Sequence, residues 1–119
     1  MELRFARFDH PDEVRRFDKG IFELVTIGGM TLGRASYEPG WRWSVDVAPT
    51  AGTPTCQVEH LGYVVSGRAM AAMDDGTEAV MEPGDLFAIP PGHDSWVVGD
   101  EPYVSIHFLG ADGYAAAHD

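Results

Sequence analysis

Hydrophobic and polar residues alternate with a period of two along most of the chain, which is the spacing of β-strands. Glycine, proline and aspartate interrupt the alternation at short intervals and mark turns. The predicted strands cover residues 22–27, 30–38, 41–47, 56–67, 68–73, 78–81, 86–89, 96–98 and 103–109, with a loop over 48–55. Strands that follow one another about every 8 to 12 residues predict an all-β antiparallel sandwich or barrel.

The first 20 residues follow a different pattern. Residues 1–8 mix charged and apolar side chains, which predicts either an edge strand or an extended arm. Pro11 stands at the start of a segment with acids in its first turn, and this arrangement predicts a short helix over residues 11–19. Gly20 is placed to end that helix.

The segment 56–67 contains the strand around which the rest is organised. Its alternate positions place two sets of side chains on opposite faces: Val58, His60, Gly62 and Val64 on one, and Glu59, Leu61, Tyr63 and Val65 on the other. Because both faces carry apolar residues, the strand is predicted to be covered on both. One face therefore takes His60 into a protected interior, where an imidazole needs a polar partner.

The chain of 119 residues is long enough to bury a core without disulfides, and no linker divides it, so residues 1–119 are predicted to form one domain. Cys56 is the single cysteine, which excludes an internal disulfide and suits a reducing compartment. No apolar run approaches the roughly 18 residues that span a membrane. The first residues are charged and lack a secretory signal. These features predict a cytoplasmic protein that has no membrane partner.

The net charge of −11 is unevenly distributed. Residues 1–20 hold five bases and five acids, whereas residues 69–119 hold ten acids and no lysine or arginine. The acidic half would repel a phosphate backbone, so the charge pattern argues against a nucleic-acid partner. The simplest interpretation of the acid excess is solubility.

Two glycine and proline motifs resemble those of the cupin superfamily over roughly residues 30–109. Gly84, Pro90 and Gly92 match the second cupin motif, and Gly67 matches the glycine that ends the first. The resemblance implies a double-stranded β-helix (jelly-roll) cupin barrel over about 30–109, preceded by an arm and a short N-terminal helix within 1–20. The stretches Cys-x3-His-x-Gly-Tyr and Pro-Pro-Gly-His-Asp are similar to those of a subgroup of small bacterial cupin proteins, which implies no particular reaction.

The metal positions depart from the family pattern. The usual pair of histidines would fall at Pro54 and Cys56, the usual glutamate at His60, and the fourth usual ligand at Ser95. The side chains present that could bind a metal are Cys56, His60, His93 and His107.

Each of these residues could also have a purely structural role without binding a metal. His60 could be a hydrogen-bonded core histidine, and His93 a solvent-exposed turn residue. Four residues of straight strand span about 13 Å, so Cys56 and His60 could share an ion only if the chain bends between them. Without that bend, Cys56 is a small buried hydrophobic residue. His107 fits the inward face of its strand imperfectly.

A cysteine and histidine set favours a divalent transition metal such as Zn, Ni, Fe or Cu. The first hypothesis is a metal-binding cupin in which His60 and His93 hold the ion beside a small organic ligand. The alternative is a metal-free small-molecule-binding or sensory module, because Pro54 and Ser95 replace usual ligands. The sequence leaves open whether the protein is an enzyme. The resemblance also implies a homodimer, for which the apolar side chains of residues 1–8 offer an edge.

Overall fold

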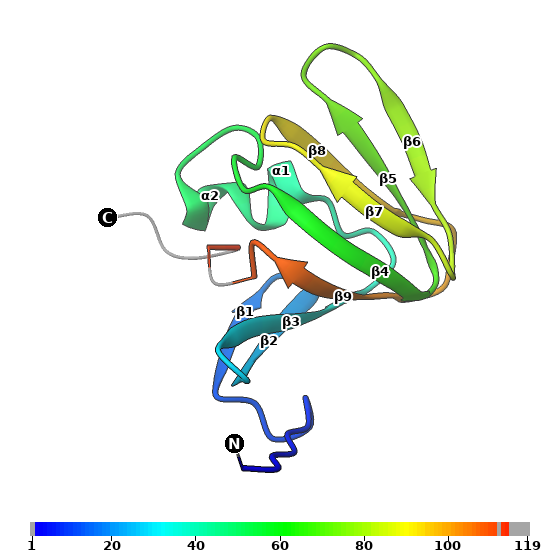
Figure 1. The fold of residues 1–119 in the computed structure, drawn as a ribbon. Coiled ribbons are helices and arrows are strands. Elements are labelled where there is room, and N and C mark those ends of the chain that lie inside the picture. The colour runs from blue at the N-terminus through cyan, green and yellow to red at the C-terminus, as the bar shows by residue number, and fades with distance from the viewer. Residues whose placement is uncertain (1, 112, 115–119) are drawn as a thin grey trace.

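Two antiparallel β-sheets face each other in the computed structural model, which describes residues 2–111 and 113–114 (Figure 1). The larger sheet has the strand order β1-β2-β3-β9-β4-β7, and the smaller one has the order β6-β5-β8. The larger sheet contains β1 (Glu13–Phe17), β2 (Gly20–Ile27), β3 (Met30–Tyr37), β4 (His60–Ser66), β7 (Leu86–Ile89) and β9 (Tyr103–Leu109). The smaller sheet contains β5 (Arg68–Met73), β6 (Glu78–Met81) and β8 (His93–Val98). The all-β prediction is therefore confirmed.

The predicted helix over residues 11–19 is wrong. Residues Glu13–Phe17 form β1 and pair with β2 through a two-residue turn in which Lys19 has a φ of 60°. Asp12, predicted to lie in the first helical turn, instead accepts a hydrogen bond at 2.8 Å from the backbone N–H of Thr26. Pairing with β2 gives the backbone groups of β1 partners that the short helix could not have provided at its ends.

The predicted strand over residues 41–47 is also wrong, because its centre is the short helix α1 (Trp43–Asp46). Trp43 and Val47 are buried four residues apart, as on one face of a helix, whereas Val45 is 62% exposed. The carboxylate of Asp46 accepts a hydrogen bond at 2.8 Å from the backbone N–H of Arg42, the residue before the helix. Alternation alone could not separate the two structures because both bury Trp43 and Val47.

A second short helix, α2 (Ala48–Ala51), occupies the first half of the predicted loop at 48–55. Pro49 lies in its first turn, and Gly52 ends it in the left-handed conformation. Both helices lie between β3 and β4 along the chain. Within the described residues, no helix has the length and apolar character needed to cross a membrane.

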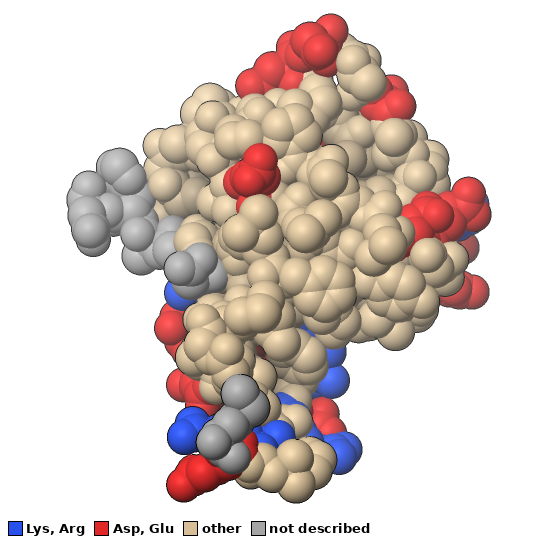
Figure 2. All heavy atoms as spheres, viewed as in Figure 1, with Lys and Arg blue, Asp and Glu red and all other residues tan. Residues whose placement is uncertain are grey.

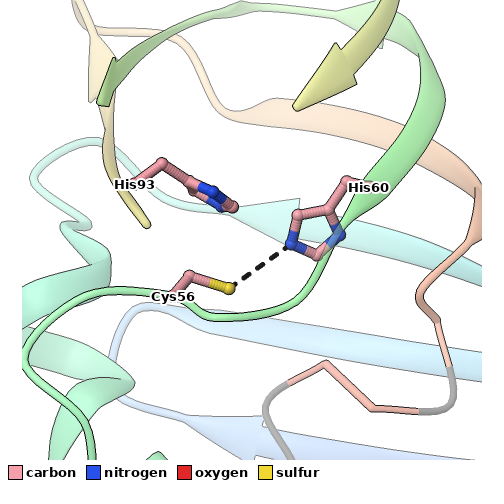
Figure 3. A group of neighbouring side chains, drawn as sticks. All are labelled: Cys56, His60 and His93. Carbon is pink, nitrogen blue, oxygen red and sulfur yellow. Dashed lines mark hydrogen bonds between the residues drawn. The ribbon is translucent and has the colours of Figure 1, made fainter. Parts of the chain in front are cut away.

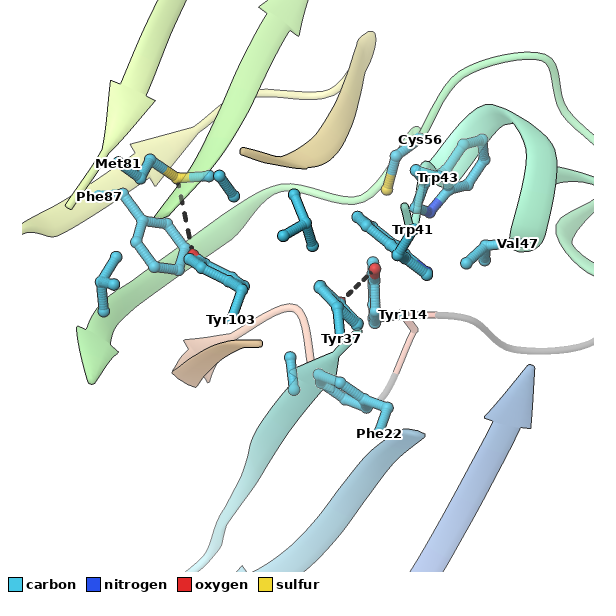
Figure 4. Close-up of a cluster of buried hydrophobic side chains, with 14 of the residues drawn as sticks. Phe22, Tyr37, Trp41, Trp43, Val47, Cys56, Met81, Phe87, Tyr103 and Tyr114 are labelled. Atoms are coloured by element: carbon cyan, nitrogen blue, oxygen red, sulfur yellow. Dashed lines mark hydrogen bonds between the residues drawn. The ribbon is translucent and has the colours of Figure 1, made fainter. Parts of the chain in front are cut away.

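The core lies between the two sheets and is rich in aromatic side chains (Figure 4). Tyr37 stacks on Trp41 with ring centroids 3.7 Å apart and an angle of 7° between the ring planes. The residues buried most completely are Phe22, Ala35, Trp41, Trp43, Val47, Cys56, Val64, Ala69, Tyr103 and Ala111. This apolar filling surrounds the polar side chains described below.

The central strand β4 is buried on one face only. His60, Gly62 and Val64 point into the barrel, as their alternation predicts. The opposite face is partly exposed in this chain, with Leu61 at 43% and Val65 at 48%. The prediction that both faces are covered is therefore wrong for the single chain.

Gly62 lets β4 approach its neighbours closely. A Cβ atom at this position would overlap the backbone oxygen of Ile106 on β9 and the ring of Phe87 on β7. We expect Gly62→Ala to lower the free energy of unfolding by about 1–3 kcal/mol, because the added methyl group forces strands apart. Urea unfolding of the variant measures this loss. Gly113→Ala, where a Cβ atom would meet Val58 at 3.7 Å and the Gly110 carbonyl oxygen at 4.0 Å, both ordinary contacts, is the matched control and should leave the stability unchanged. Equal stability of both variants would contradict the prediction.

Candidate metal centre

Cys56, His60 and His93 come together inside the barrel from three different points of the chain (Figure 3). His60 begins β4 and pairs with Ile89 at the end of β7. His93 begins β8 and forms an isolated antiparallel bridge with Cys56. The backbone N–H of Cys56 donates to the carbonyl of His93 at 2.7 Å. The turn between β7 and β8 thus places His93 beside the segment that leads into β4.

The three side chains have the spacing of a metal site. Their ligand atoms all lie within 4.8 Å of one another, and all three residues are buried. The Sγ atom of Cys56 lies 3.4 Å from Nε2 of His60. A tetrahedral ion with bonds of about 2.3 Å to sulfur and about 2.0–2.1 Å to nitrogen separates such atoms by about 3.6 Å. The residues present therefore fit a metal ion.

Cys56 reaches His60 because the chain is not straight between them. Residues 57–59 belong to no strand, and β4 begins only at His60. The bridge with His93 holds Cys56 to the smaller sheet, while His60 pairs within the larger one. The chain bends where it passes from one sheet to the other, although residues 57–59 carry no sequence signal for a bend.

His93 is oriented by a hydrogen bond to the backbone. Its Nδ1 lies 2.8 Å from the carbonyl oxygen of Pro90. Because a carbonyl oxygen only accepts, Nδ1 carries the proton and Nε2 keeps its lone pair. Histidine ligands of metals commonly donate their other N–H in this way, which fixes the tautomer and the direction of the ring.

His107 lies beside the three-residue group and is not part of it. Its ring centroid is 5.1 Å from that of His60, and its Nε2 is 3.1 Å from Oγ of Ser105. Nδ1 of His60 and Nδ1 of His107 are both buried and have no hydrogen-bond partner among the described residues. His107 therefore packs edge-on against His60 and lies outside the group of Cys56, His60 and His93.

Burial controls the charge of the whole group. It lowers the pKa of His60 to about 2, with smaller contributions from His107 and His93, and lowers the pKa of His107 to about 3. Burial also lowers the pKa of His93, against the effect of the Pro90 carbonyl, and raises the pKa of the Cys56 thiol to about 11. Without a metal ion, the site at neutral pH therefore consists of three neutral imidazoles and a thiol.

A cavity of about 30 Å³ adjoins His60 and His93 of this group. It has room for about two water-sized molecules, since one water needs roughly 10–15 Å³ measured in this way. Its wall combines aromatic and aliphatic surface with the polar atoms of three histidines, three tyrosines and two serines. The side chains that line it together with His60, His93 and His107 are Tyr37, Trp41, Ala69, Met81, Phe87, Ile89, Ser95, Tyr103, Ser105 and Tyr114.

Tyr114 is the lining residue that the sequence pattern did not indicate. It lies beyond the last predicted strand, which ends at residue 109, yet its ring is buried 5.0 Å from that of His60. Its hydroxyl accepts a hydrogen bond at 2.5 Å from the hydroxyl of Tyr37. Arg15 on β1 donates at 2.6 Å to the Tyr114 backbone carbonyl, a contact between residues 99 positions apart. No local signal predicts a contact at that separation.

Comparison with protein-family models finds no match for this sequence, and comparison with curated proteins finds none either. Solved structures do resemble it. A protein of unknown function from Rhizobium leguminosarum bv. viciae 3841 has a TM-score of 0.64 at 18% identity, over 99% of this chain and 100% of that one. A DUF1255 protein of unknown function from Acinetobacter sp. ADP1 has a TM-score of 0.61 at 16% identity, over 87% of this chain and 97% of that one.

A third similar structure describes the fold directly. It is an uncharacterized conserved protein with a double-stranded β-helix domain from Klebsiella pneumoniae, with a TM-score of 0.60 at 18% identity. The match covers 99% of this chain and 100% of that one. The chain therefore has the cupin-type double-stranded β-helix fold, and it carries a Cys-His-His cluster that could hold a metal inside the barrel.

The buried neutral histidines make stability depend on pH. Below pH 6.5 the unfolded chain protonates His60 and His107, whereas the folded protein does not until about pH 2 and about pH 3. The contribution of these neutral histidines to the free energy of unfolding is complete above pH 6.5 and is lost as the pH falls. We expect a loss of about 1.4 kcal/mol per histidine for each pH unit below 6.5.

Urea unfolding of metal-free protein at pH 7.5 and pH 5.5 measures this slope. His107→Gln should remove one histidine's share, and replacement of the exposed His10 by Gln is the control that should leave the slope unchanged. A free energy of unfolding that is the same at both pH values would contradict the expectation.

Proposed function

We propose that this protein binds a divalent transition metal through Cys56, His60 and His93 and that a small organic molecule approaches the ion through the adjoining cavity. The observation that carries the proposal is the convergence of three buried ligand atoms within 4.8 Å of one another. Sγ of Cys56 and Nε2 of His60 already face each other at 3.4 Å, and an ion shared with His93 would replace this contact with metal bonds. The proposal takes His60, His93 and Cys56 as ligands and His107 as their neighbour.

The ligand types favour Zn, Ni, Fe or Cu. One thiolate and two imidazoles suit ions of borderline softness and disfavour Mg²⁺ or Ca²⁺, which prefer oxygen. Held by Cys56, His60 and His93 with one position open, such an ion would supply Lewis-acid chemistry, the activation of water or the polarisation of a carbonyl. Ser95, at the position of the family's fourth ligand, lines the cavity and leaves that position open.

The protein's own groups hold the ligands in place. The Pro90 carbonyl directs the Nε2 lone pair of His93 toward the group. The thiol proton of Cys56 has to leave when the sulfur binds a metal, because the thiolate is the ligand. His107 lies where it can polarise or orient the ring of His60, the role that outer groups play around many metal sites.

The small volume of the cavity limits what can react there. The space beside His60 and His93 admits the reacting end of a molecule, not a bulky substrate. Met81, Phe87 and Tyr103 supply apolar wall, so a charged group that does not reach the ion is disfavoured in the cavity.

Metal titration tests the proposal directly. We expect the tag-free protein to bind about one equivalent of Zn²⁺ or Co²⁺, with a thiolate-to-cobalt charge-transfer band that Cys56→Ser abolishes. His60→Ala and His93→Ala should each weaken metal binding more than about 100-fold. His107→Phe should weaken it only about 10–100-fold, which is typical of groups that support the ligands without binding the metal. His10→Ala is the control that should bind like the parent.

Two results would count against a metal centre. One is less than about a tenth of an equivalent of any transition metal after reconstitution. The other is parental affinity in the Cys56, His60 and His93 variants alike. Either result would favour the metal-free binding module, in which the neutral thiol and imidazoles hydrogen-bond a ligand directly.

The volume of the cavity gives a separate prediction. In the cobalt-loaded protein, a triatomic ligand such as azide should shift the d–d absorption, whereas imidazole should not, because the cavity holds about two water-sized molecules. Met81→Ala should enlarge the cavity and admit imidazole. Equal binding of azide and imidazole by the parent would contradict the size limit while leaving the metal site itself intact.

A further inference from the structure

Two buried tyrosines meet at the wall of the cavity beside the candidate metal centre (Figure 4). Tyr37 is 5% exposed and Tyr114 is 3% exposed. The hydroxyl of Tyr37 donates a hydrogen bond at 2.5 Å to the hydroxyl oxygen of Tyr114. Burial raises the pKa of both tyrosines well above the usual value for this side chain, so both hydroxyls keep their hydrogens at neutral pH.

The pair of tyrosines has one hydrogen more than it uses internally. Each hydroxyl carries a single hydrogen, so the hydrogen bond between the two hydroxyls leaves the hydrogen of the accepting one free. That hydrogen belongs to Tyr114, whose hydroxyl has no acceptor among the described residues. It points away from Tyr37, because the two hydrogens would otherwise collide. Buried polar groups are nearly always hydrogen-bonded, so this free donor needs an acceptor that is not yet accounted for.

The imidazole nitrogens nearby do not accept this hydrogen. The ring of Tyr114 lies 5.0 Å from that of His60 and 5.8 Å from that of His107. Nδ1 of each histidine has no hydrogen-bond partner among the described residues. Nε2 of His60 faces the sulfur of Cys56, and Nε2 of His107 faces Oγ of Ser105. In the described part of the chain, the hydroxyl of Tyr114 therefore remains an unused donor at the cavity wall.

Tyr114 lies beyond the last strand, yet its backbone is held at several points. Arg15 on β1 donates to the backbone carbonyl of Tyr114 at 2.6 Å and to that of Ala111 at 3.3 Å. Gly110 has a φ of 86°, and a Cβ atom there would overlap the backbone oxygen of Glu59, just before β4. The hydroxyl of Tyr114 is thus placed before any ligand arrives, and a preorganised donor binds at a lower entropic cost.

The cavity offers no charged side chain to a ligand. Among the described residues, no lysine, arginine, aspartate or glutamate lines it. The charged side chains in Figure 2 lie on the outer surface, with the bases mostly toward the end formed by the N-terminal residues and the strands β1 to β3. A charged group that does not reach the ion would therefore lack a partner in the cavity. An uncharged molecule with an acceptor atom fits this environment.

We propose that the cavity binds a small uncharged carbonyl compound whose oxygen accepts the free hydrogen of the Tyr114 hydroxyl. A carbonyl oxygen brings lone pairs and no hydrogen, so it satisfies the donor without adding another one, whereas an alcohol would bring a hydrogen of its own. Tyr37 is a positioning residue, because its hydrogen bond turns the hydrogen of Tyr114 away from it. The inference rests on the proposed function for the ion beside the cavity, and it adds the class of molecule that binds there.

Two probes of the same shape test the donor in the metal-free full chain. Acetonitrile stands in for the carbonyl compound because it has an acceptor atom and no polar hydrogen, and propyne has the same shape without the acceptor. We expect Tyr114→Phe to weaken acetonitrile binding about fivefold to tenfold, the effect of one lost hydrogen bond, and to leave propyne binding unchanged. Nuclear magnetic resonance titration measures both affinities. Tyr63→Phe, at a partly exposed tyrosine outside the cavity, is the control and should bind both probes like the parent.

Tyr37→Phe separates the donor from a packing role. It keeps the hydrogen of Tyr114, so acetonitrile binding should fall less than about twofold, the smaller part of the loss of one hydrogen bond. Equal losses in Tyr37→Phe and Tyr114→Phe would indicate altered packing and overturn the inference. The C≡N stretch of acetonitrile bound to the parent needs no variant: a hydrogen bond raises its frequency above the value in an alkane.

Zinc affinity, measured beside these titrations, separates this inference from the proposed metal centre. Tyr114→Phe should bind zinc like the parent, because Tyr114 is not one of the three ligands. A parent that binds no zinc but prefers acetonitrile through Tyr114 supports the donor and contradicts only the metal centre. Equal acetonitrile affinity in the parent and Tyr114→Phe overturns the inference even if zinc binds, and so does a bound nitrile with the frequency found in an alkane.

Discussion

The backbone bridge between Cys56 and His93 is the contact on which the candidate metal centre depends. It holds the segment before β4 against the start of β8 and thereby brings a thiol from one sheet to an imidazole of the other. His60 sits at the first residue of β4, just after the bend. Without the bridge, Cys56 and His60 would lie along one extended chain, too far apart to share an ion. The geometry of the site is thus a consequence of strand pairing.

Burying the polar side chains of the site in an apolar interior costs free energy, and a bound ion would offset part of that cost. Three histidines and a cysteine are buried against aromatic side chains, and burial keeps all four neutral without a metal. Two imidazole nitrogens have no partner among the described residues. An ion held by Cys56, His60 and His93 would replace the contact between the thiol and Nε2 of His60 with metal bonds. The rigid aromatic wall keeps the adjoining cavity small.

The two faces of β4 have different surroundings. The inward face carries His60, and Gly62 allows the close packing of β7 and β9 around it. The outward face carries Leu61, Tyr63 and Val65, which remain partly exposed in the single chain.

The sequence by itself determined the all-β class, most strand positions and the inward direction of His60, because alternation and turn residues are local properties. It did not determine the structure of residues 13–17, where the spacing of Val14 and Phe17 suits a helix, or of residues 43–46, where the spacing of Trp43 and Val47 suits both a helix and a strand. Pairing with β2 decided the first, and packing of Trp43 and Val47 decided the second. Only the tertiary structure brought Cys56 within reach of His60 and placed Tyr114 in the cavity wall. Both depend on contacts between residues distant in sequence, and such contacts leave no periodic signal along the chain.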